Sequence, residues 1–242
     1  MDITVNAINL KGLDYGENDK LCTLYSAQNG KITVILKGVK KAAAKLKFAA
    51  MPFCFGEYSL SKSNSRYIVT GCTSDFIFFD ISADIDKYYT GCCILECVDQ
   101  MGVEDVKNPN LFLLTLNVLK TLSFEEAEKS DLYKILIKFF LEALRLSGYK
   151  LNLEKCVNCN AALKETLFFL PESGGFTCNL CRHGVKTTFL IYTSLRLIDI
   201  TDFEQLKTLI LDEQALKNVL KLLKGYLGYL GYHLKVIDRL VN

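Results

Sequence analysis

The hydrophobic pattern of residues 1–82 is that of short β-strands. Runs of β-branched and aromatic residues are separated by turn-forming stretches such as Gln28-Asn29-Gly30. The runs are ITVNAINL, DKLCTLYS, KITVILK, FCFGEYSLS and RYIVTGCTSDFIFFDI. A helical insertion, KGVKKAAAKLKFAAM, is expected between the third run and the fourth. Five short strands with one insertion predict a small closed barrel of the OB-fold type, which commonly binds single-stranded nucleic acid.

From residue 83 onward the hydrophobic period becomes helical. In SDLYKILIKFFLEALRLSGY the apolar residues recur at i, i+3 and i+4, which predicts a core helix. Ser130 is its expected N-cap and Gly148 its stop signal. Segments 84–101 and 109–123 also have helical patterns. The sequence therefore predicts an OB-fold nucleic-acid-binding domain at residues 1–82 and a helical domain at residues 83–242.

The last predicted helix, at about residues 212–235, contains the repeat GYLGYLGYH. Each of Gly225, Gly228 and Gly231 costs about 1 kcal/mol relative to alanine within a helix. That cost predicts a close approach of another element to the helix backbone. A groove for a partner peptide is the alternative.

Composition describes an ordinary folded protein. Of the 242 residues, 50% are hydrophobic and 23% are charged, which argues against a disordered chain. The N-terminal stretch MDITVNAINLKG lacks the features of a secretory signal, and charges interrupt every apolar run before it could span a bilayer. We therefore expect a cytoplasmic protein with no membrane contact, whose cysteines are reduced.

Four of the ten cysteines have the spacing of a zinc site. Cys156, Cys159, Cys178 and Cys181 form the pattern C-x2-C-x18-C-x2-C. Each two-residue gap lets one turn point both sulfurs at a single ion, and PESGG between the pairs predicts a hairpin that returns the chain. A shell of four thiolates is closed, so one structural zinc is expected in a knuckle at about residues 153–190. The predicted fold class is thus α+β, with this four-cysteine zinc knuckle inserted in the helical domain.

Other interpretations of the cysteines stay open. The quartet could instead be two buried or oxidised pairs, and a catalytic zinc would need an open position with a histidine or carboxylate nearby. His183 is expected to lie in an exposed loop. The remaining six are expected to be buried free thiols. They are Cys22, Cys54, Cys72, Cys92, Cys93 and Cys97.

Positive charge is concentrated around the predicted insertion. Between residues 31 and 47 there are six lysines and no acid, although the net charge of the chain is only +2. These lysines are Lys31, Lys37, Lys40, Lys41, Lys45 and Lys47. Such a cluster suits a polyanion, because each neutralised phosphate releases a condensed counterion, but an ordinary solvated face is an equal alternative. Tyr15 and Phe48 are candidates for stacking on bases, although packing is the simpler role for both.

The order of these parts resembles the bacterial RecO family of DNA recombination and repair proteins. Three stretches carry the resemblance: YGENDKLCTLYSAQNGKITVILKGVKK, then FLEALRLSGYKLNLEKCVNCN with PESGGFTCNLC, and finally LLKGYLGYLGYHL. The second stretch is the most specific. Lys40 and Lys41 stand where the family commonly has arginine, so bidentate phosphate contacts are replaced by point charges.

The resemblance implies a recombination mediator and not an enzyme. It implies binding to single- and double-stranded DNA, annealing of complementary strands, and binding to the C-terminal tail of the single-strand-binding protein SSB. With RecR, such a protein helps to load RecA onto SSB-coated strands, so RecA is an indirect partner, and a nucleoid-associated location follows. A zinc-ribbon scaffold without direct DNA binding is the alternative. A zinc-ribbon enzyme is disfavoured because the chain has only two histidines, His183 and His233.

Overall fold

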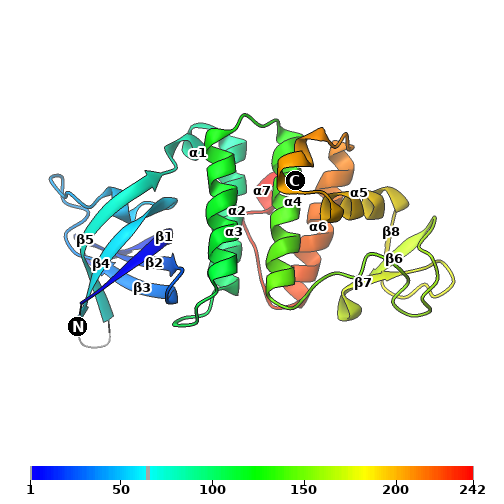
Figure 1. Cartoon of the computed structure of the whole chain (residues 1–242), viewed down its shortest axis with the longest axis horizontal. Coiled ribbons are helices and arrows are strands. Elements are labelled where there is room, and N and C mark those ends of the chain that lie inside the picture. Colours follow the sequence, from blue (N-terminus) through cyan, green and yellow to red (C-terminus); the bar gives the residue numbers. More distant parts are fainter. Residues whose placement is uncertain (1, 64–65, 242) are drawn as a thin grey trace. The chain divides into compact units, whose positions relative to one another are not determined.

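The computed structural model describes residues 2–63 and 66–241 (Figure 1). By packing, the chain forms two compact units, of which the first ends at Glu125 and the second begins at Glu126. The chain changes from strand to helix between Ile77 and Phe79, a few residues before the expected boundary at residues 82–83, and packing places the first three helices with the barrel. The α+β class, with an N-terminal OB-like barrel and helices after it, is confirmed. Within the described ranges, no helix is both long and apolar enough to cross a membrane.

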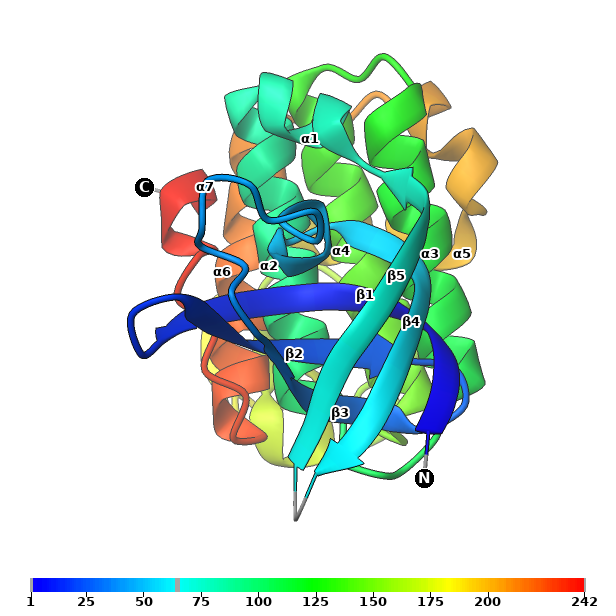
Figure 2. The same cartoon turned by 90° about the vertical axis from the view of Figure 1, so that its left-hand side faces the viewer.

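Five strands close the barrel in the order β1-β2-β3-β5-β4, with β4 returning to pair with β1 (Figure 2). The strands are β1 (Asp2–Tyr15), β2 (Asp19–Ser26), β3 (Gly30–Leu36), β4 (Cys54–Ser63) and β5 (Arg66–Ile77). β3 and β5 pair in parallel, and the other four pairings are antiparallel. Alternate residues of β3, namely Ile32, Val34 and Leu36, are buried in the barrel core, as the two-residue period of a strand requires.

The connection between β3 and β4 is not the helix expected at residues 37–51. It consists of turns and one short 3₁₀-helix, η1 (Phe48–Ala50). The Gly38 amide donates to the Asp19 carboxylate at the start of β2 over 2.7 Å, and the Lys40 amide donates to the Asn18 carbonyl over 2.9 Å, so neither enters a helical ladder. Farther along, Ala49 is fully buried and its carbonyl accepts two side-chain hydrogen bonds from the barrel. These contacts outweigh the helix propensity of the alanines, because propensity is a weak preference.

Three helices complete the first unit: α1 (Phe79–Ala83), α2 (Ile85–Met101) and α3 (Pro109–Phe124). Asp84 caps α2 and Asn108 caps α3, each by accepting a hydrogen bond from the amide three residues ahead. Phe112 of α3 contacts the rings of Tyr25 and Phe55 in the barrel, with centroid distances of 6.4 and 6.2 Å. Both long helices predicted for this part of the chain are confirmed.

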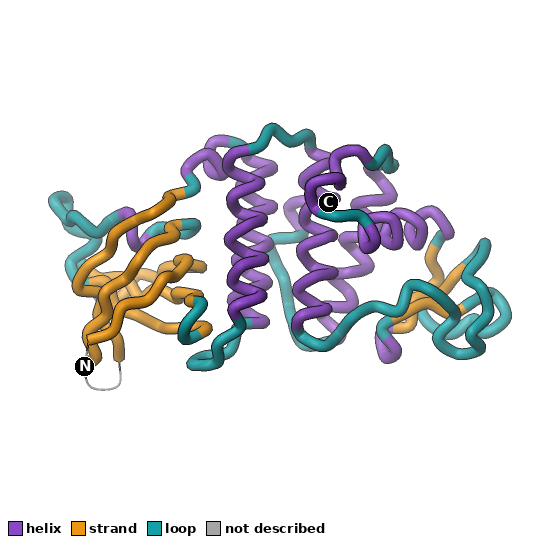
Figure 3. Tube along the Cα trace, viewed as in Figure 1, coloured by secondary structure: helices purple, strands orange, loops and turns teal. Residues whose placement is uncertain are grey.

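The second unit is built on one central helix, α4, which packs against α5, η3 and α6 (Figure 3). Its helices are α4 (Lys129–Leu146), α5 (Phe189–Ile200), η3 (Phe203–Thr208), α6 (Glu213–Tyr229) and α7 (Asp238–Val241). The predicted core helix is therefore confirmed, but its N-cap is Glu128 and not Ser130. Glu128 and Asp131 form a reciprocal capping box, which satisfies amides at the start of α4.

Two lysines of α4 are buried and tie the helix to its surroundings. The Nζ of Lys134 donates to the Leu209 carbonyl over 3.0 Å, and the Nζ of Lys138 donates to the Asp199 carbonyl over 2.8 Å. Each also has a carboxylate of α4 within 3.1 Å. Their charges are thus compensated inside the unit, as burial of a charge requires.

The helix that carries the glycine repeat, α6, is shorter than predicted. It ends at Tyr229, and Gly231 follows with a φ of 92°, a left-handed conformation that favours glycine after a helix. Gly225 and Gly228 lie inside the helix. A methyl group at Gly225 would meet no heavy atom within 4 Å beyond the adjoining helix backbone. The expectation that another element approaches this backbone closely is therefore wrong at Gly225.

Candidate metal centre and nucleic-acid surface

The four-cysteine segment folds around a small sheet of the second unit. The sheet has the order β7-β6-β8, with β6 (Leu167–Leu170), β7 (Gly175–Thr177) and β8 (Val185–Thr187). The predicted hairpin is present between β6 and β7, where Gly174 has a left-handed φ of 55°. One cysteine pair precedes β6 and the other follows β7, so the hairpin brings the pairs together.

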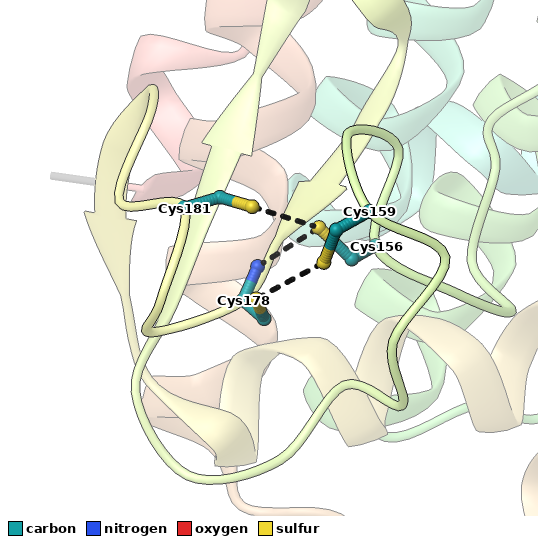
Figure 4. A group of neighbouring side chains, drawn as sticks. All are labelled: Cys156, Cys159, Cys178 and Cys181. Carbon is teal, nitrogen blue, oxygen red and sulfur yellow. Dashed lines mark hydrogen bonds between the residues drawn. The ribbon is translucent and has the colours of Figure 1, made fainter.

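All four sulfur atoms converge on one point (Figure 4). They lie within 4.8 Å of one another, with 3.8 Å between Cys156 and Cys181 and 3.6 Å between Cys159 and Cys178. A tetrahedral zinc with Zn–S bonds of about 2.3 Å requires sulfur–sulfur distances of about 3.8 Å. A disulfide requires about 2.05 Å, so the cysteines are not bonded to each other. The chemistry and the spacing of this donor set therefore fit zinc.

Two turns of the same design present the cysteines. In one, the amide of Asn160 donates to the Cys156 carbonyl over 2.9 Å; in the other, the amide of Arg182 donates to the Cys178 carbonyl over 3.0 Å. Asn160 and Arg182 both have left-handed φ angles, of 60° and 52°. Each turn thus reverses the chain directly after its second cysteine and leaves two thiols on the same side.

Hydrogen bonds to sulfur favour the thiolate that a metal needs. Burial disfavours charge on Cys156, but amides of Cys159, Cys178 and Asn158 lower the pKa of its thiol to about 6. The Cys178 amide lies 3.3 Å from this sulfur. The pKa of Cys181 shifts in the opposite direction. Its thiol donates a hydrogen bond to Cys159, and this is the largest cause that raises its pKa to about 12. A bound cation would take the place of the protons that these neighbouring sulfurs share.

Other candidate ligands stay outside the cluster. His183 is exposed, and its Nδ1 lies 2.9 Å from the Asn158 side-chain amide. Four of the remaining cysteines are buried free thiols, as expected, whereas Cys72 and Cys92 are partly exposed. Over the part of the chain that the structure describes, the residues grouped so that they could hold a metal ion are the four knuckle cysteines.

Aromatic residues connect the knuckle to the helices of its own unit. Phe176 of β7 contacts Tyr192 of α5, and Phe169 of β6 contacts Tyr226 of α6, with centroid distances of 5.2 and 5.6 Å. The Tyr192 hydroxyl also donates to the Leu153 carbonyl over 2.8 Å. The knuckle is therefore part of the packed unit and not a free appendage.

The six predicted DNA-binding lysines divide into two groups. Lys31 turns toward α2, where its Nζ donates to the Asp99 carbonyl over 2.7 Å. Lys40 pairs with the Asp14 carboxylate over 2.8 Å, which lowers the pKa of Asp14. The other four are exposed on the β3–β4 connection, and their side chains make no hydrogen bond or ion pair with any described residue. They are Lys37, Lys41, Lys45 and Lys47.

The two aromatic residues that are candidates for stacking on bases differ in their exposure to solvent. Phe48 packs against the barrel core, whereas Tyr15 is 41% exposed. Arg66 was missed by the sequence analysis: its Nη1 donates to the Tyr15 hydroxyl over 2.7 Å, and its guanidinium lies 5.7 Å from the ring centroid. Since the two residues are far apart in the chain, only the closure of the barrel brings them together.

Two family models match the chain in the expected order. The model described as Recombination protein O N terminal matches residues 1–74, and the model described as Recombination protein O C terminal matches residues 82–235. The chain belongs to the RecO family. Family membership implies a mediator of DNA repair and recombination.

Individual relatives within the RecO family cover most of the chain. The DNA repair protein RecO of Clostridium perfringens is 28% identical over 222 residues, which is 90% of this chain and 89% of that protein. The RecO of Desulforamulus reducens is 30% identical over 234 residues, which is 93% of this chain and 88% of that protein. The RecO of Pelotomaculum thermopropionicum is 32% identical over 176 residues, which is 73% of this chain and 67% of that protein. The two family models together extend across the barrel, the central helix and the cysteine knuckle.

Proposed function

We propose that this chain is a recombination mediator and not an enzyme. It binds single- and double-stranded DNA, anneals complementary strands and, with RecR, helps to load RecA onto strands coated by SSB, whose C-terminal tail it also binds. The observation that carries the DNA contact is the β3–β4 connection of an OB-like barrel, with four exposed lysines whose side chains pair with no acid among the described residues. An action at the nucleoid follows from that role and stays a prediction.

The lysines suit sequence-independent binding. Exposed ammonium groups on a connecting segment can follow a phosphate backbone without reading bases, and counterion release drives such binding. Annealing needs two polyanions held together while their charge is reduced, which the same surface provides. We expect Lys37, Lys41, Lys45 and Lys47 to contribute most, because Lys31 and Lys40 already have partners within the unit.

For the cysteine cluster we propose one structural zinc ion held by Cys156, Cys159, Cys178 and Cys181. The ion would cross-link the two turns, and a shell of four thiolates leaves no open position for a reaction. Elemental analysis of the purified protein is expected to give about one zinc per chain, as a single closed site requires. Protein without zinc, iron or another thiophilic metal would refute this part of the proposal.

An annealing assay tests the DNA function directly. Complementary oligonucleotides, one of them fluorescent, are mixed with the protein in the presence and absence of SSB. We expect the protein to accelerate duplex formation in both conditions, and the acceleration to weaken steeply as salt is raised. A protein that binds RecR or the SSB tail but neither binds nor anneals DNA would instead be a zinc-ribbon scaffold.

A further inference from the structure

The four knuckle cysteines differ in their access to solvent. Cys156 and Cys178 are buried, Cys181 is partly exposed and Cys159 is exposed. A reagent dissolved in water therefore meets the Cys159 sulfur first. A free thiol carries a proton at neutral pH, whereas a cysteine that ligates zinc is a thiolate, which is the nucleophilic form. Cys159 thus combines exposure to solvent with the form of cysteine that reacts.

A second sulfur lies within reach of Cys159. The Sγ of Cys178 is 3.6 Å away, although it belongs to the other turn (Figure 4). A disulfide needs about 2.05 Å, so the two sulfurs have to approach each other by about 1.5 Å. The other two cysteines have the same arrangement, since Cys156 and Cys181 also come from different turns and lie 3.8 Å apart.

Hydrogen bonds hold the two turns together independently of a metal. The amide of Val157, inside the first turn, donates to the carbonyl of Phe176, just before the second turn, over 2.9 Å. The side-chain nitrogen of Asn158 lies 2.9 Å from Nδ1 of His183, which follows the second turn. These contacts keep the sulfurs of the two turns adjacent, so oxidation is expected to link one turn to the other.

We propose that the knuckle is a site of reversible oxidation, at which a peroxide links Cys159 to Cys178 and thereby releases the bound zinc. The inference rests on the zinc site proposed above and adds the class of reagent to which that site responds. Release follows because the disulfide removes two of the four thiolate ligands that close the shell. DNA binding by the β3–β4 connection needs none of these thiols.

The reaction is a two-electron oxidation. The Cys159 thiolate attacks one oxygen of hydrogen peroxide, the O–O bond breaks, and hydroxide leaves, which gives a sulfenic acid on Cys159. The Cys178 thiolate then attacks the Cys159 sulfur, so that the S–S bond forms, the S–O bond breaks and a second hydroxide leaves. Each thiolate has lost one electron, and one peroxide has been reduced to two hydroxide ions. A dithiol reductant reverses the oxidation by thiol–disulfide exchange.

Peroxide titration of the full chain tests the proposal. Zinc-containing protein is treated with hydrogen peroxide, and the released zinc is measured with a chelating dye. Free thiols are then alkylated in acid, so that mass spectrometry can map the disulfides. We expect released zinc to rise in proportion to the Cys159–Cys178 disulfide, up to about one ion per chain. Dithiothreitol with added zinc should restore both the thiols and the bound metal.

Cys159→His separates the role of ligand from that of reactive thiol. Histidine ligates zinc but cannot form a disulfide, so this variant should bind zinc and release it to peroxide slowly. Cys181→His is the matched variant, because it also leaves three thiolates but keeps the Cys159–Cys178 pair, and it should release zinc at least about tenfold faster than Cys159→His. Cys72→Ser with Cys92→Ser removes the partly exposed thiols outside the knuckle and should leave zinc release unchanged. Zinc analysis and thermal unfolding verify that each variant is loaded and folded.

Two outcomes contradict the proposal. If peroxide oxidises Cys72 or Cys92 while zinc stays bound, the knuckle is not the oxidation site. If zinc leaves without formation of the Cys159–Cys178 disulfide, the 3.6 Å contact does not direct the reaction. The zinc content before peroxide is added tests the zinc site itself, so failure of that proposal is distinguishable from resistance of a zinc-containing knuckle to peroxide.

Discussion

The cysteine knuckle and the β3–β4 connection were both identified from residue type and spacing, but their side chains are arranged differently in the structure. In the knuckle all four cysteines converge, with sulfur–sulfur distances of 3.6 and 3.8 Å within the two closest pairs. Of the six lysines, only four have exposed side chains without a partner among the described residues, because Asp99 and Asp14 engage Lys31 and Lys40. A local spacing rule therefore identified a cluster that converges in full in one region and a set that divides in the other.

The reason lies in how each group is positioned. A Cys-x-x-Cys turn places two sulfurs together by its own backbone geometry, and one hairpin then unites two turns. A lysine has a long flexible side chain, and its partner comes from whichever element packs nearby. Lys134 and Lys138 of α4 show the extreme case, since both are buried and bound to carbonyl groups.

The largest effect is expected from the knuckle. Cys156→Ser together with Cys159→Ser removes two of four ligands, so bound zinc should fall from about one per chain to near zero. Because metal binding contributes directly to folding, the free energy of unfolding should drop by at least about 4 kcal/mol. Elemental analysis and thermal unfolding measure the two quantities.

Cys72→Ser with Cys92→Ser is the matched control, since these thiols are partly exposed and lie outside the cluster. This variant should keep its zinc. Full metal retention after loss of Cys156 and Cys159 would contradict the assignment of the site.

A second effect concerns the free lysines. Reversal of Lys37, Lys41, Lys45 and Lys47 to glutamate should weaken binding to a single-stranded oligonucleotide at least about tenfold at low salt. The slope of log affinity against log salt should also fall by about 3 if all four contact phosphates. Filter binding across a salt series gives both values, and an unchanged slope would show that DNA binds elsewhere.

A smaller effect on DNA affinity is expected from the two lysines whose side chains already have partners. Lys31→Gln with Lys40→Gln should reduce DNA affinity by less than about threefold, because these side chains are already engaged. Lys37→Gln with Lys41→Gln changes the charge equally and should reduce affinity more. Equal losses in the same binding assay would mean that the contacts with Asp99 and Asp14 open when DNA binds.

The smallest effect is a change in the free energy of unfolding caused by replacing the glycines in and after α6. Gly225→Ala should raise the free energy of unfolding by about 0.5–1 kcal/mol, since alanine is the better helix former and nothing obstructs its methyl group. Gly231→Ala should lower it, because a φ of 92° strains any residue with a side chain. Urea unfolding measures both, and two changes of the same sign would contradict this explanation of the glycines.

Much of the fold was accessible from hydrophobic periodicity. Five strand-like runs gave the barrel, and the apolar stripe of residues 130–149 gave the core helix α4. The failures occur where long-range contacts decide local structure. The β3–β4 connection has three consecutive alanines and is still not a helix, because the barrel fixes its backbone. The start of α4 was misjudged because Glu128 and Asp131 form a capping box that competes with Ser130.

By itself, the sequence determined the strands, the long helices, the four candidate metal ligands and the family, since periodicity and short spacings express local geometry. The tertiary structure alone decided which lysine side chains lack a partner among the described residues, that Arg66 meets Tyr15, and that Gly225 lines a pocket of the second unit. These features depend on which residues from distant parts of the chain become neighbours. Side-chain partnership, burial and empty space arise only when the elements pack, so they have no signature in the local pattern.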